Sequence, residues 1–111
     1  MLSVTNETFT KFVLETSLKH PVVIDLWAEW CGPCKLFSPV YEKVSKDYSY
    51  EMDFVKLNID DNLELAEKYG IKSIPAILVF NKSEPIVQIV GMIPEDKLRS
   101  ELEHVLALTK N

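Results

Sequence analysis

The feature that most limits the possible folds is the segment from Trp30 to Lys35, which reads Trp-Cys-Gly-Pro-Cys-Lys and holds both cysteines of the chain. An apolar, β-branched run from Val22 to Trp27 precedes it and is typical of a buried strand. An apolar stripe at helical spacing follows it, made of Leu36, Phe37, Val40, Tyr41 and Val44. The sequence therefore predicts that Cys31 and Cys34 lie where a buried strand ends and a helix begins.

This position gives the two cysteines different chemistry. A helix N-terminus has unpaired backbone N–H groups and a partial positive charge, so it stabilises an anion. Cys31 is therefore the expected attacking thiolate, with a lowered pKa, and Cys34, a turn further in, is the expected resolving thiol and the more buried of the two. Pro33 suits the first helical turn, and Gly32 leaves room for the backbone of a binding partner.

Two other uses of a cysteine pair are less consistent with the sequence. A zinc site requires about four ligands, but there is no third cysteine, and His20 and His104 lie far apart in the chain. A structural disulfide normally closes a longer loop, because its stabilising effect grows with loop length. The pair therefore indicates a redox-active dithiol–disulfide centre, with no metal.

Composition and charge narrow the class of protein. The 111 residues predict a single domain, residues 1–111. There are 12 Lys and Arg against 17 Asp and Glu, a formal charge of −5, with no basic stripe, so nucleic-acid or anionic membrane partners are not expected. The first residues do not resemble a signal peptide, and no apolar run is long enough to span a bilayer. We therefore expect a cytoplasmic monomer. Because the cytoplasm is reducing, a cysteine pair there is usually catalytic and not a lasting structural disulfide.

The remaining elements are predicted from periodicity and from capping and turn residues. In chain order, they are an edge strand over 2–4, a helix from Thr5 or Asn6 to Leu18, the strand to Trp27, a helix from Pro33 to about Ser49, a strand over 52–59, a helix to Tyr69 started by an Asp61–Glu64 capping box, strands over 76–80 and 86–90, and a helix from Pro94. Pro39 should bend the long helix; the alternative is a split into two helices.

The order β-α-β-α-β-α-β-β-α predicts an α/β fold with a central mixed sheet and helices on both faces. The early strand connections should be right-handed parallel crossovers, and the last two strands should form an antiparallel hairpin.

Four stretches resemble the thioredoxin family along essentially the whole chain. They are Asp25 to Lys35, Lys56 to Asp60, Tyr69 to Ala76, and Val90 with Gly91. The resemblance implies the thioredoxin fold and a general protein-disulfide reductase, an electron carrier that acts in cell redox homeostasis. It also implies disulfide-containing proteins as substrates, an NADPH-dependent thioredoxin reductase as electron donor, and no cofactor in the domain itself.

The resemblance also implies a substrate-binding surface beside the cysteines. A cis peptide bond would precede Pro75 and face them, and the backbone of Ile74 would pair with an extended substrate segment. Together with Trp30 and Gly91, Ile74 would form a flat, uncharged patch. Leu26, Ala76 and Pro94 depart from the residues common in the family at their positions, which leaves local stability and partner preference open.

Asp25 interrupts the otherwise apolar strand. A buried carboxyl group is costly and has a raised pKa, and Cys34 must lose its proton in order to attack. We therefore predict that Asp25 accepts this proton, directly or through a water molecule. Lys56, the one charge in its own strand, is the candidate partner of Asp25, as the family pattern suggests. The alternative is that both side chains face solvent at a sheet edge.

The sequence leaves two other functions open. A disulfide oxidant or isomerase could use the same fold, although Pro33 between the cysteines favours a reductase. A non-redox binding module could use the same patch to recruit a partner.

Overall fold

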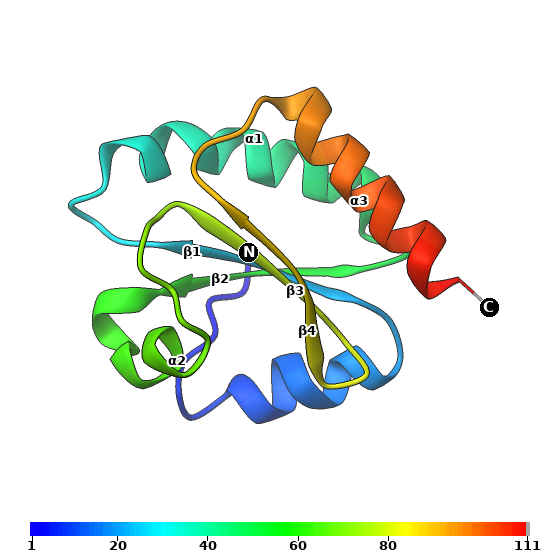
Figure 1. The fold of residues 1–111 in the computed structure, drawn as a ribbon, viewed down its shortest axis with the longest axis horizontal. Helices are drawn as coiled ribbons and strands as arrows, with labels where there is room; N and C mark the ends of the chain where they lie inside the picture. The colour runs from blue at the N-terminus through cyan, green and yellow to red at the C-terminus, as the bar shows by residue number, and fades with distance from the viewer. Residues whose placement is uncertain (111) are drawn as a thin grey trace.

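A computed structural model describes residues 1–110 and contains a four-stranded mixed sheet (Figure 1). The strands are β1 (Val22–Trp27), β2 (Asp53–Asn58), β3 (Ala76–Asn81) and β4 (Glu84–Val90), in the spatial order β2-β1-β3-β4. β1 is parallel to β2 and antiparallel to β3, and β3 is antiparallel to β4. The predicted mixed sheet, its parallel pair and its final hairpin are confirmed.

Helices lie on both faces of this sheet. α1 (Gly32–Tyr48) and α3 (Glu95–Thr109) lie on one face, and α2 (Leu63–Lys68) and the N-terminal helical turns lie on the other (Figure 1). These turns are η1 (Thr10–Glu15) and η2 (Thr16–Leu18), and a further turn, η3 (Ile59–Asp61), follows β2. No helix within residues 1–110 has the length and apolar character needed to cross a membrane.

The alternation of side chains along β1 divides the core into two layers. Val22, Ile24 and Leu26 pack toward the N-terminal turns, whereas Val23 packs with residues of α1 and α3. Because alternate strand residues share a face, Asp25 projects into the layer beneath α1, as Val23 does. Lys56 of β2 is the register partner of Asp25 and lies in the same layer.

α1 is continuous through Pro39, so the alternative of two separate helices is wrong. Its buried stripe includes Phe37, Tyr41 and Val44. The Tyr41 hydroxyl lies 3.0 Å from the carbonyl oxygen of Val23 and 2.9 Å from that of Val55. This hydroxyl therefore ties α1 to the two central strands.

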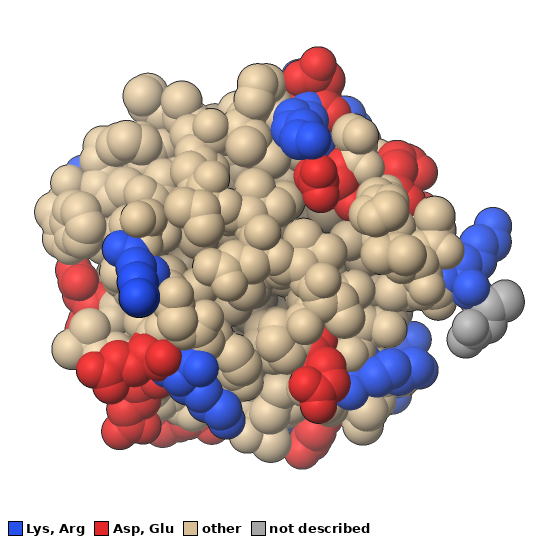
Figure 2. All heavy atoms as spheres, in the orientation of Figure 1, with Lys and Arg blue, Asp and Glu red and all other residues tan. Residues whose placement is uncertain are grey.

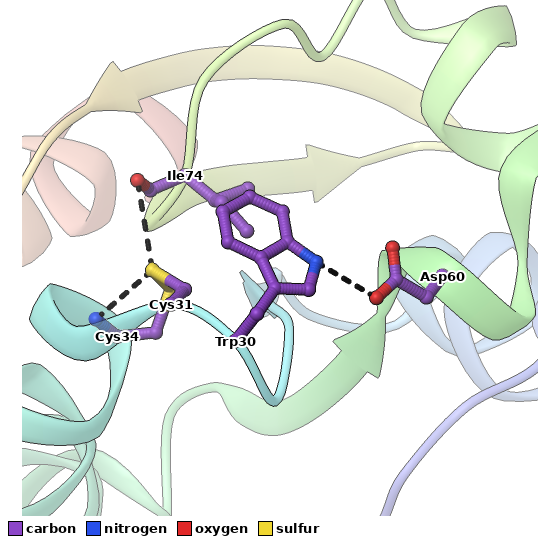
Figure 3. Close-up of a disulfide and its surroundings, with 5 residues drawn as sticks. All are labelled: Trp30, Cys31, Cys34, Asp60 and Ile74. Carbon is purple, nitrogen blue, oxygen red and sulfur yellow. Dashed lines mark hydrogen bonds between the residues drawn. A yellow bond between two sulfur atoms is a disulfide. The ribbon is translucent and has the colours of Figure 1, made fainter.

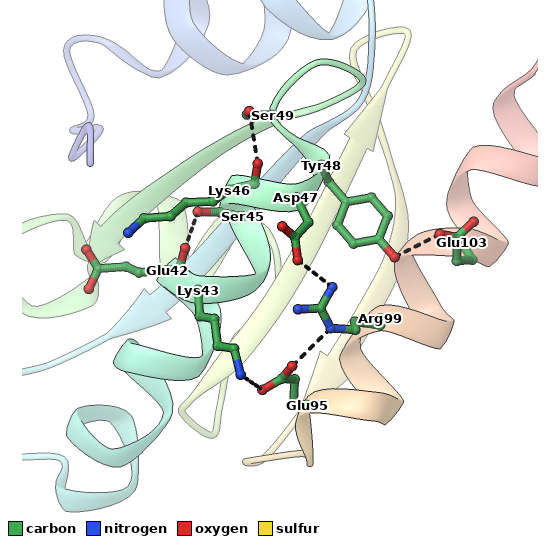
Figure 4. A network of polar contacts seen from close by, with 10 residues as sticks. All are labelled: Glu42, Lys43, Ser45, Lys46, Asp47, Tyr48, Ser49, Glu95, Arg99 and Glu103. Carbon is green, nitrogen blue, oxygen red and sulfur yellow. Dashed lines mark hydrogen bonds and ion pairs between the residues drawn. The ribbon is translucent and has the colours of Figure 1, made fainter.

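Polar contacts also hold α1 against α3 (Figure 4). Lys43 of α1 pairs with Glu95 at 3.0 Å, and Arg99 of α3 pairs with Asp47 at 2.8 Å and with Glu95 at 3.1 Å. The hydrogen bonds from Lys43 and Arg99 lower the pKa of Glu95. Two cations and two carboxylates thus form one chain of ion pairs across the helix–helix contact.

The N-terminal segment differs from the predicted strand and α-helix. The expected edge strand is a single bridge between Ser3 and Lys56, because Thr5 and Thr8 bond to each other's backbone N–H groups and start a turn at once. The helix that follows occupies the predicted place but has π and then 3₁₀ geometry. Here the Leu14 carbonyl accepts hydrogen bonds from two serine hydroxyls.

The start of α2 also differs from the prediction. Asn62 is the N-cap residue and makes no side-chain capping bond, so the capping box of Asp61 and Glu64 is wrong. The Asn62 side chain instead accepts from the Asn6 backbone N–H at 2.8 Å and donates to the Asn58 carbonyl at 2.9 Å. The bond from Asn6 holds the loop before α2 against the N-terminal segment, and the bond to Asn58 ties this loop to the end of β2.

Candidate active site

The two cysteines form a disulfide at the start of α1, with their Cα atoms 5.3 Å apart (Figure 3). Cys31 is the N-cap residue, and its Sγ accepts a hydrogen bond from the Cys34 backbone N–H at 3.2 Å. Pro33 lies in the first helical turn, as predicted. Cys31 and Cys34 are 3% and 2% exposed, so the expected contrast in burial between them is almost absent in the disulfide form.

A loop from the opposite side of the sheet lies over this disulfide. The Sγ of Cys31 lies 3.8 Å from the carbonyl oxygen of Ile74 (Figure 3), and the peptide bond between Ile74 and Pro75 is cis. The Gly91 backbone N–H donates to the Pro75 carbonyl at 2.8 Å, and Gly91 has a φ of 93°, a conformation that favours glycine. The structure thus brings Ile74, Pro75 and Gly91 together with the cysteines.

Trp30 directly precedes Cys31 in the chain and is 69% exposed. Its Nε1–H donates to Asp60 Oδ2 at 2.9 Å (Figure 3), a contact that the sequence analysis missed because 30 residues separate the two. Leu36, which follows the cysteines, and Met92, which follows Gly91, are also exposed. In Figure 2, uncharged side chains cover most of the surface over the start of α1, whereas acidic ones gather over α2.

Asp25 lies in the layer beneath α1 and is 1% exposed. Neither carboxyl oxygen has a hydrogen-bond partner in the structure. Burial raises the pKa of Asp25 from 3.8 to about 7; the charge of Lys56 lowers this pKa and that of Glu42 raises it. β1 is a central strand, so the alternative of a solvent-facing Asp25 at a sheet edge is wrong.

Lys56 neighbours Asp25 in the sheet, but its ammonium group binds elsewhere. Its Nζ donates to Ser38 Oγ at 2.9 Å and lies 5.2 Å from the centre of the Trp27 ring. Within residues 1–110, no ion pair of 4.0 Å or less joins Lys56 to Asp25. Ser38 is a further site residue that sequence reasoning missed, because its polar neighbour comes from a different element.

This arrangement is suited to thiol–disulfide exchange. It places a cysteine pair at a helix N-terminus, where a thiolate is stabilised, and a buried acid able to bind or release a proton near neutral pH in the layer beneath the same helix. Among residues 1–110, no three His, Cys, Asp or Glu side chains gather in a way that could hold a metal ion.

Comparisons with known proteins agree with a site for thiol–disulfide exchange. The sequence model of the Thioredoxin family matches residues 1–104. The chain is 40% identical to "Thioredoxin 1" of Synechococcus elongatus over 101 residues, which is 91% of this chain and 92% of the relative. It is 40% identical to "Thioredoxin" of Synechocystis sp. over 103 residues (93% and 94%), and 38% identical to "Thioredoxin M-type, chloroplastic" of Chlamydomonas reinhardtii over 104 residues (94% and 73%).

Proposed function

This chain belongs to the thioredoxin family and is a thiol–disulfide oxidoreductase that acts as a protein-disulfide reductase, and we propose that Cys31 is its nucleophile and Cys34 its resolving thiol. The observation that carries these roles is the position of the Cys31 Sγ. It caps the helix, accepts from a backbone N–H and lies beside the Ile74 carbonyl. The same N–H and helix terminus stabilise the thiolate after reduction.

In the first step, the Cys31 thiolate attacks one sulfur of a substrate disulfide. A mixed disulfide forms between Cys31 and that sulfur, and the other substrate sulfur leaves as a thiolate. In the second step, Cys34 gives its proton to Asp25 and attacks the Cys31 sulfur. The mixed disulfide breaks, the second substrate thiolate leaves, and the Cys31–Cys34 disulfide has formed, so two electrons pass to the substrate.

Asp25 suits the role of proton acceptor because it combines burial with a pKa of about 7. An acid with that pKa accepts a proton readily at neutral pH and returns it to solvent in the next cycle. Lys56 acts as its electrostatic partner, because the nearby ammonium charge favours the ionised carboxylate.

The substrate binds across the patch of Trp30, Gly32, Pro33, Ile74, Pro75 and Gly91. The Ile74 carbonyl oxygen beside the Cys31 Sγ can accept a backbone N–H of an extended substrate segment. Recognition through backbone groups and uncharged surface allows many different disulfide-containing proteins to bind.

Residues 1–111 form one thioredoxin domain that works in the cytoplasm as a monomer, and an NADPH-dependent thioredoxin reductase returns its disulfide to the dithiol. The relatives named thioredoxin support the redox partners, and a relative named chloroplastic also matches.

A redox titration tests the direction of electron flow. The fluorescence of Trp27 and Trp30 is followed while the protein equilibrates with a dithiol couple of known potential. We expect a reversible two-electron transition below the cytosolic glutathione poise of about −220 to −260 mV. A midpoint far above this range would make the protein an oxidant, and the absence of a transition would favour a binding module.

A trapping experiment tests the two cysteine roles. Cys34→Ser should accumulate mixed disulfides with a disulfide-containing protein, because the second step is blocked. The matched variant Cys31→Ser should trap far less. Equal trapping by both variants, or release of substrate from Cys34→Ser at the wild-type rate, would contradict the assignment.

A further inference from the structure

Three residues of α1 form a row that leads from the disulfide to the surface. Cys34, Ser38 and Glu42 follow one another at intervals of four residues, so they lie on the same side of the helix. Cys34 is buried, Ser38 is half-buried and Glu42 is exposed. Ser38 therefore lies one helical turn from the resolving cysteine, at the boundary between the buried layer and solvent.

The Lys56 ammonium group is fixed at this boundary. Lys56 is the register partner of Asp25 in the neighbouring strand, yet its Nζ donates to Ser38 Oγ at 2.9 Å and lies over the Trp27 ring. The Asp25 carboxyl oxygens meanwhile have no hydrogen-bond partner among the described residues. A buried carboxyl group and a nearby cation would be expected to pair directly, so something must hold them apart.

The hydroxyl of Ser38 is oriented to hold the ammonium group. A hydroxyl has one proton to donate and two lone pairs to accept with. Ser38 Oγ lies 3.4 Å from Glu42 Oε2, a long contact toward which the hydroxyl can donate its proton while its lone pairs accept from Lys56.

We propose that Ser38 is a positioning residue that keeps the Lys56 ammonium group out of direct contact with Asp25, and so keeps Asp25 free to accept the proton of Cys34. This inference rests on the proposed role of Asp25 in the second step of the reaction. Without the Ser38 hydroxyl, the ammonium group would lose this acceptor. The two carboxyl oxygens of Asp25, which have no hydrogen-bond partner among residues 1–110, would then be open to it.

Direct contact would change Asp25 as a base. An opposite charge that approaches to within about 4 to 6 Å lowers the pKa of a carboxyl group by about 1 to 3 pH units. The charged and titratable side chains that interact with Asp25 are Lys56 from β2 and Glu42 and Tyr41 from α1, and Cys34 lies further toward the start of the same helix. Lys56 is the one cation among them, so the distance from its ammonium group to the Asp25 carboxyl group controls how far the pKa of Asp25 is lowered.

The test measures the titration of the Asp25 carboxyl carbon by NMR, and the pH dependence of the resolving step in single-turnover mixing. In Ser38→Ala we expect the Asp25 midpoint to fall by about one pH unit or more. The acid limb of the rate profile should move by the same interval, and the rate at alkaline pH should drop. Ser38→Thr keeps the hydroxyl and should retain the wild-type midpoint.

A Lys56→Met background provides the decisive control. If Ser38 acts through the ammonium group, Ser38→Ala should leave the Asp25 midpoint unchanged in this background. An equal shift with and without Lys56 would overturn the inference, and so would an unchanged or raised midpoint in the single variant.

Asp25→Asn separates this inference from the proposed function. If Asp25→Asn slows the resolving step while Ser38→Ala leaves the Asp25 midpoint unchanged, the role of Asp25 holds and that of Ser38 is wrong. If Asp25→Asn resolves mixed disulfides at the wild-type rate, both roles are wrong.

Discussion

The carboxyl group of Asp25 occupies a place that an apolar side chain would normally fill in β1. Its neighbours in the strand are fully buried, and neither of its oxygens has a hydrogen-bond partner within residues 1–110. Its pKa of about 7, compared with an ordinary value of 3.8, means that the folded protein holds this proton more tightly than the unfolded chain does. A residue needed for proton transfer is therefore a source of instability at neutral and alkaline pH.

Asp25→Ala should remove this pH-dependent instability. The protonated carboxyl group of Asp25 contributes fully to the free energy of unfolding below pH 3.8, and this contribution is lost as the pH rises to about 7. The loss amounts to roughly 4 kcal/mol once Asp25 is ionised. Urea unfolding at pH 4 and pH 8.5 measures the free energy of unfolding of Asp25→Ala and of the wild type. The difference, variant minus wild type, should be several kcal/mol more positive at pH 8.5 than at pH 4. A constant difference would contradict the raised pKa.

Tyr41→Phe should lower the free energy of unfolding by about 1 to 2 kcal/mol. The ring remains, but the carbonyl oxygens of Val23 and Val55 lose their contact with the buried hydroxyl. Urea unfolding measures the loss, and the matched change Tyr50→Phe, at a fully solvated side chain, should have no effect. An unchanged stability in Tyr41→Phe would show that water replaces the hydroxyl.

The burial of Asp25 could be predicted because it interrupts an apolar strand, but the contacts of Ser38 and Asn62 could not. A local pattern reports which face of an element is apolar. It does not report which polar group from another element reaches a given side chain. Ser38 and Lys56 are 18 residues apart, and Asn6 and Asn62 are 56 apart. Such pairs depend on the packing of whole elements.

The contact between α1 and α3 combines an apolar interior with a charged rim. Leu98, Leu102 and Val105 of α3 are buried. Around them, Arg99 connects to Asp47 and to Glu95, which in turn connects to Lys43 (Figure 4). These charged groups are partly solvated, so salt should screen them.

Arg99→Gln should lower the urea midpoint at low ionic strength, and the difference from the wild type should shrink in 1 M NaCl. Arg99 links two helices, so its loss weakens their packing. Lys97→Gln is the matched control, because among residues 1–110 Lys97 pairs only with Glu101 on the same helix. The idea fails if Arg99→Gln is as neutral as Lys97→Gln, or if its effect does not respond to salt.

Helices and strands with strong periodicity lie where the sequence predicts them. α1, β1 and β3 each carry long apolar patterns, and their observed bounds agree with the prediction to within about a residue. The N-terminal segment has weaker patterns, and Thr5, Thr8 and Ser17 offer side-chain bonds that compete with regular backbone pairing. Local competition of this kind explains why the predicted strand and α-helix there are not formed.

For the molecule as a whole, folding and disulfide formation are linked. The fold holds Cys31 and Cys34 at a distance that a disulfide can span, whereas an unfolded chain must lose entropy to bring them together. The native state therefore favours the disulfide over the dithiol more than the unfolded chain does. This bias makes the folded dithiol the stronger reductant, in the direction that the family's activity requires.

Reduction should lower the free energy of unfolding by about 2 kcal/mol, the effect expected for a closed loop of this length. Urea unfolding with and without a dithiol reductant measures the difference. The double variant Cys31→Ser, Cys34→Ser should have the same free energy of unfolding with and without the reductant. Equal stability of the oxidised and reduced wild type would show that folding does not bias the redox pair.

The short pairing between the N-terminal segment and β2 has a practical consequence for anyone who handles this protein. The backbone N–H and carbonyl of Lys56 are bonded to the Leu2 carbonyl and the Val4 N–H. An affinity tag or fusion partner joined ahead of Met1 would therefore lie next to β2, the strand that carries Lys56, and could disturb this pairing. The end of α3 lies on the opposite side of the molecule from the start of α1, where the cysteines are (Figure 1), so it is the better point for attachment to a resin, a dye or an electrode.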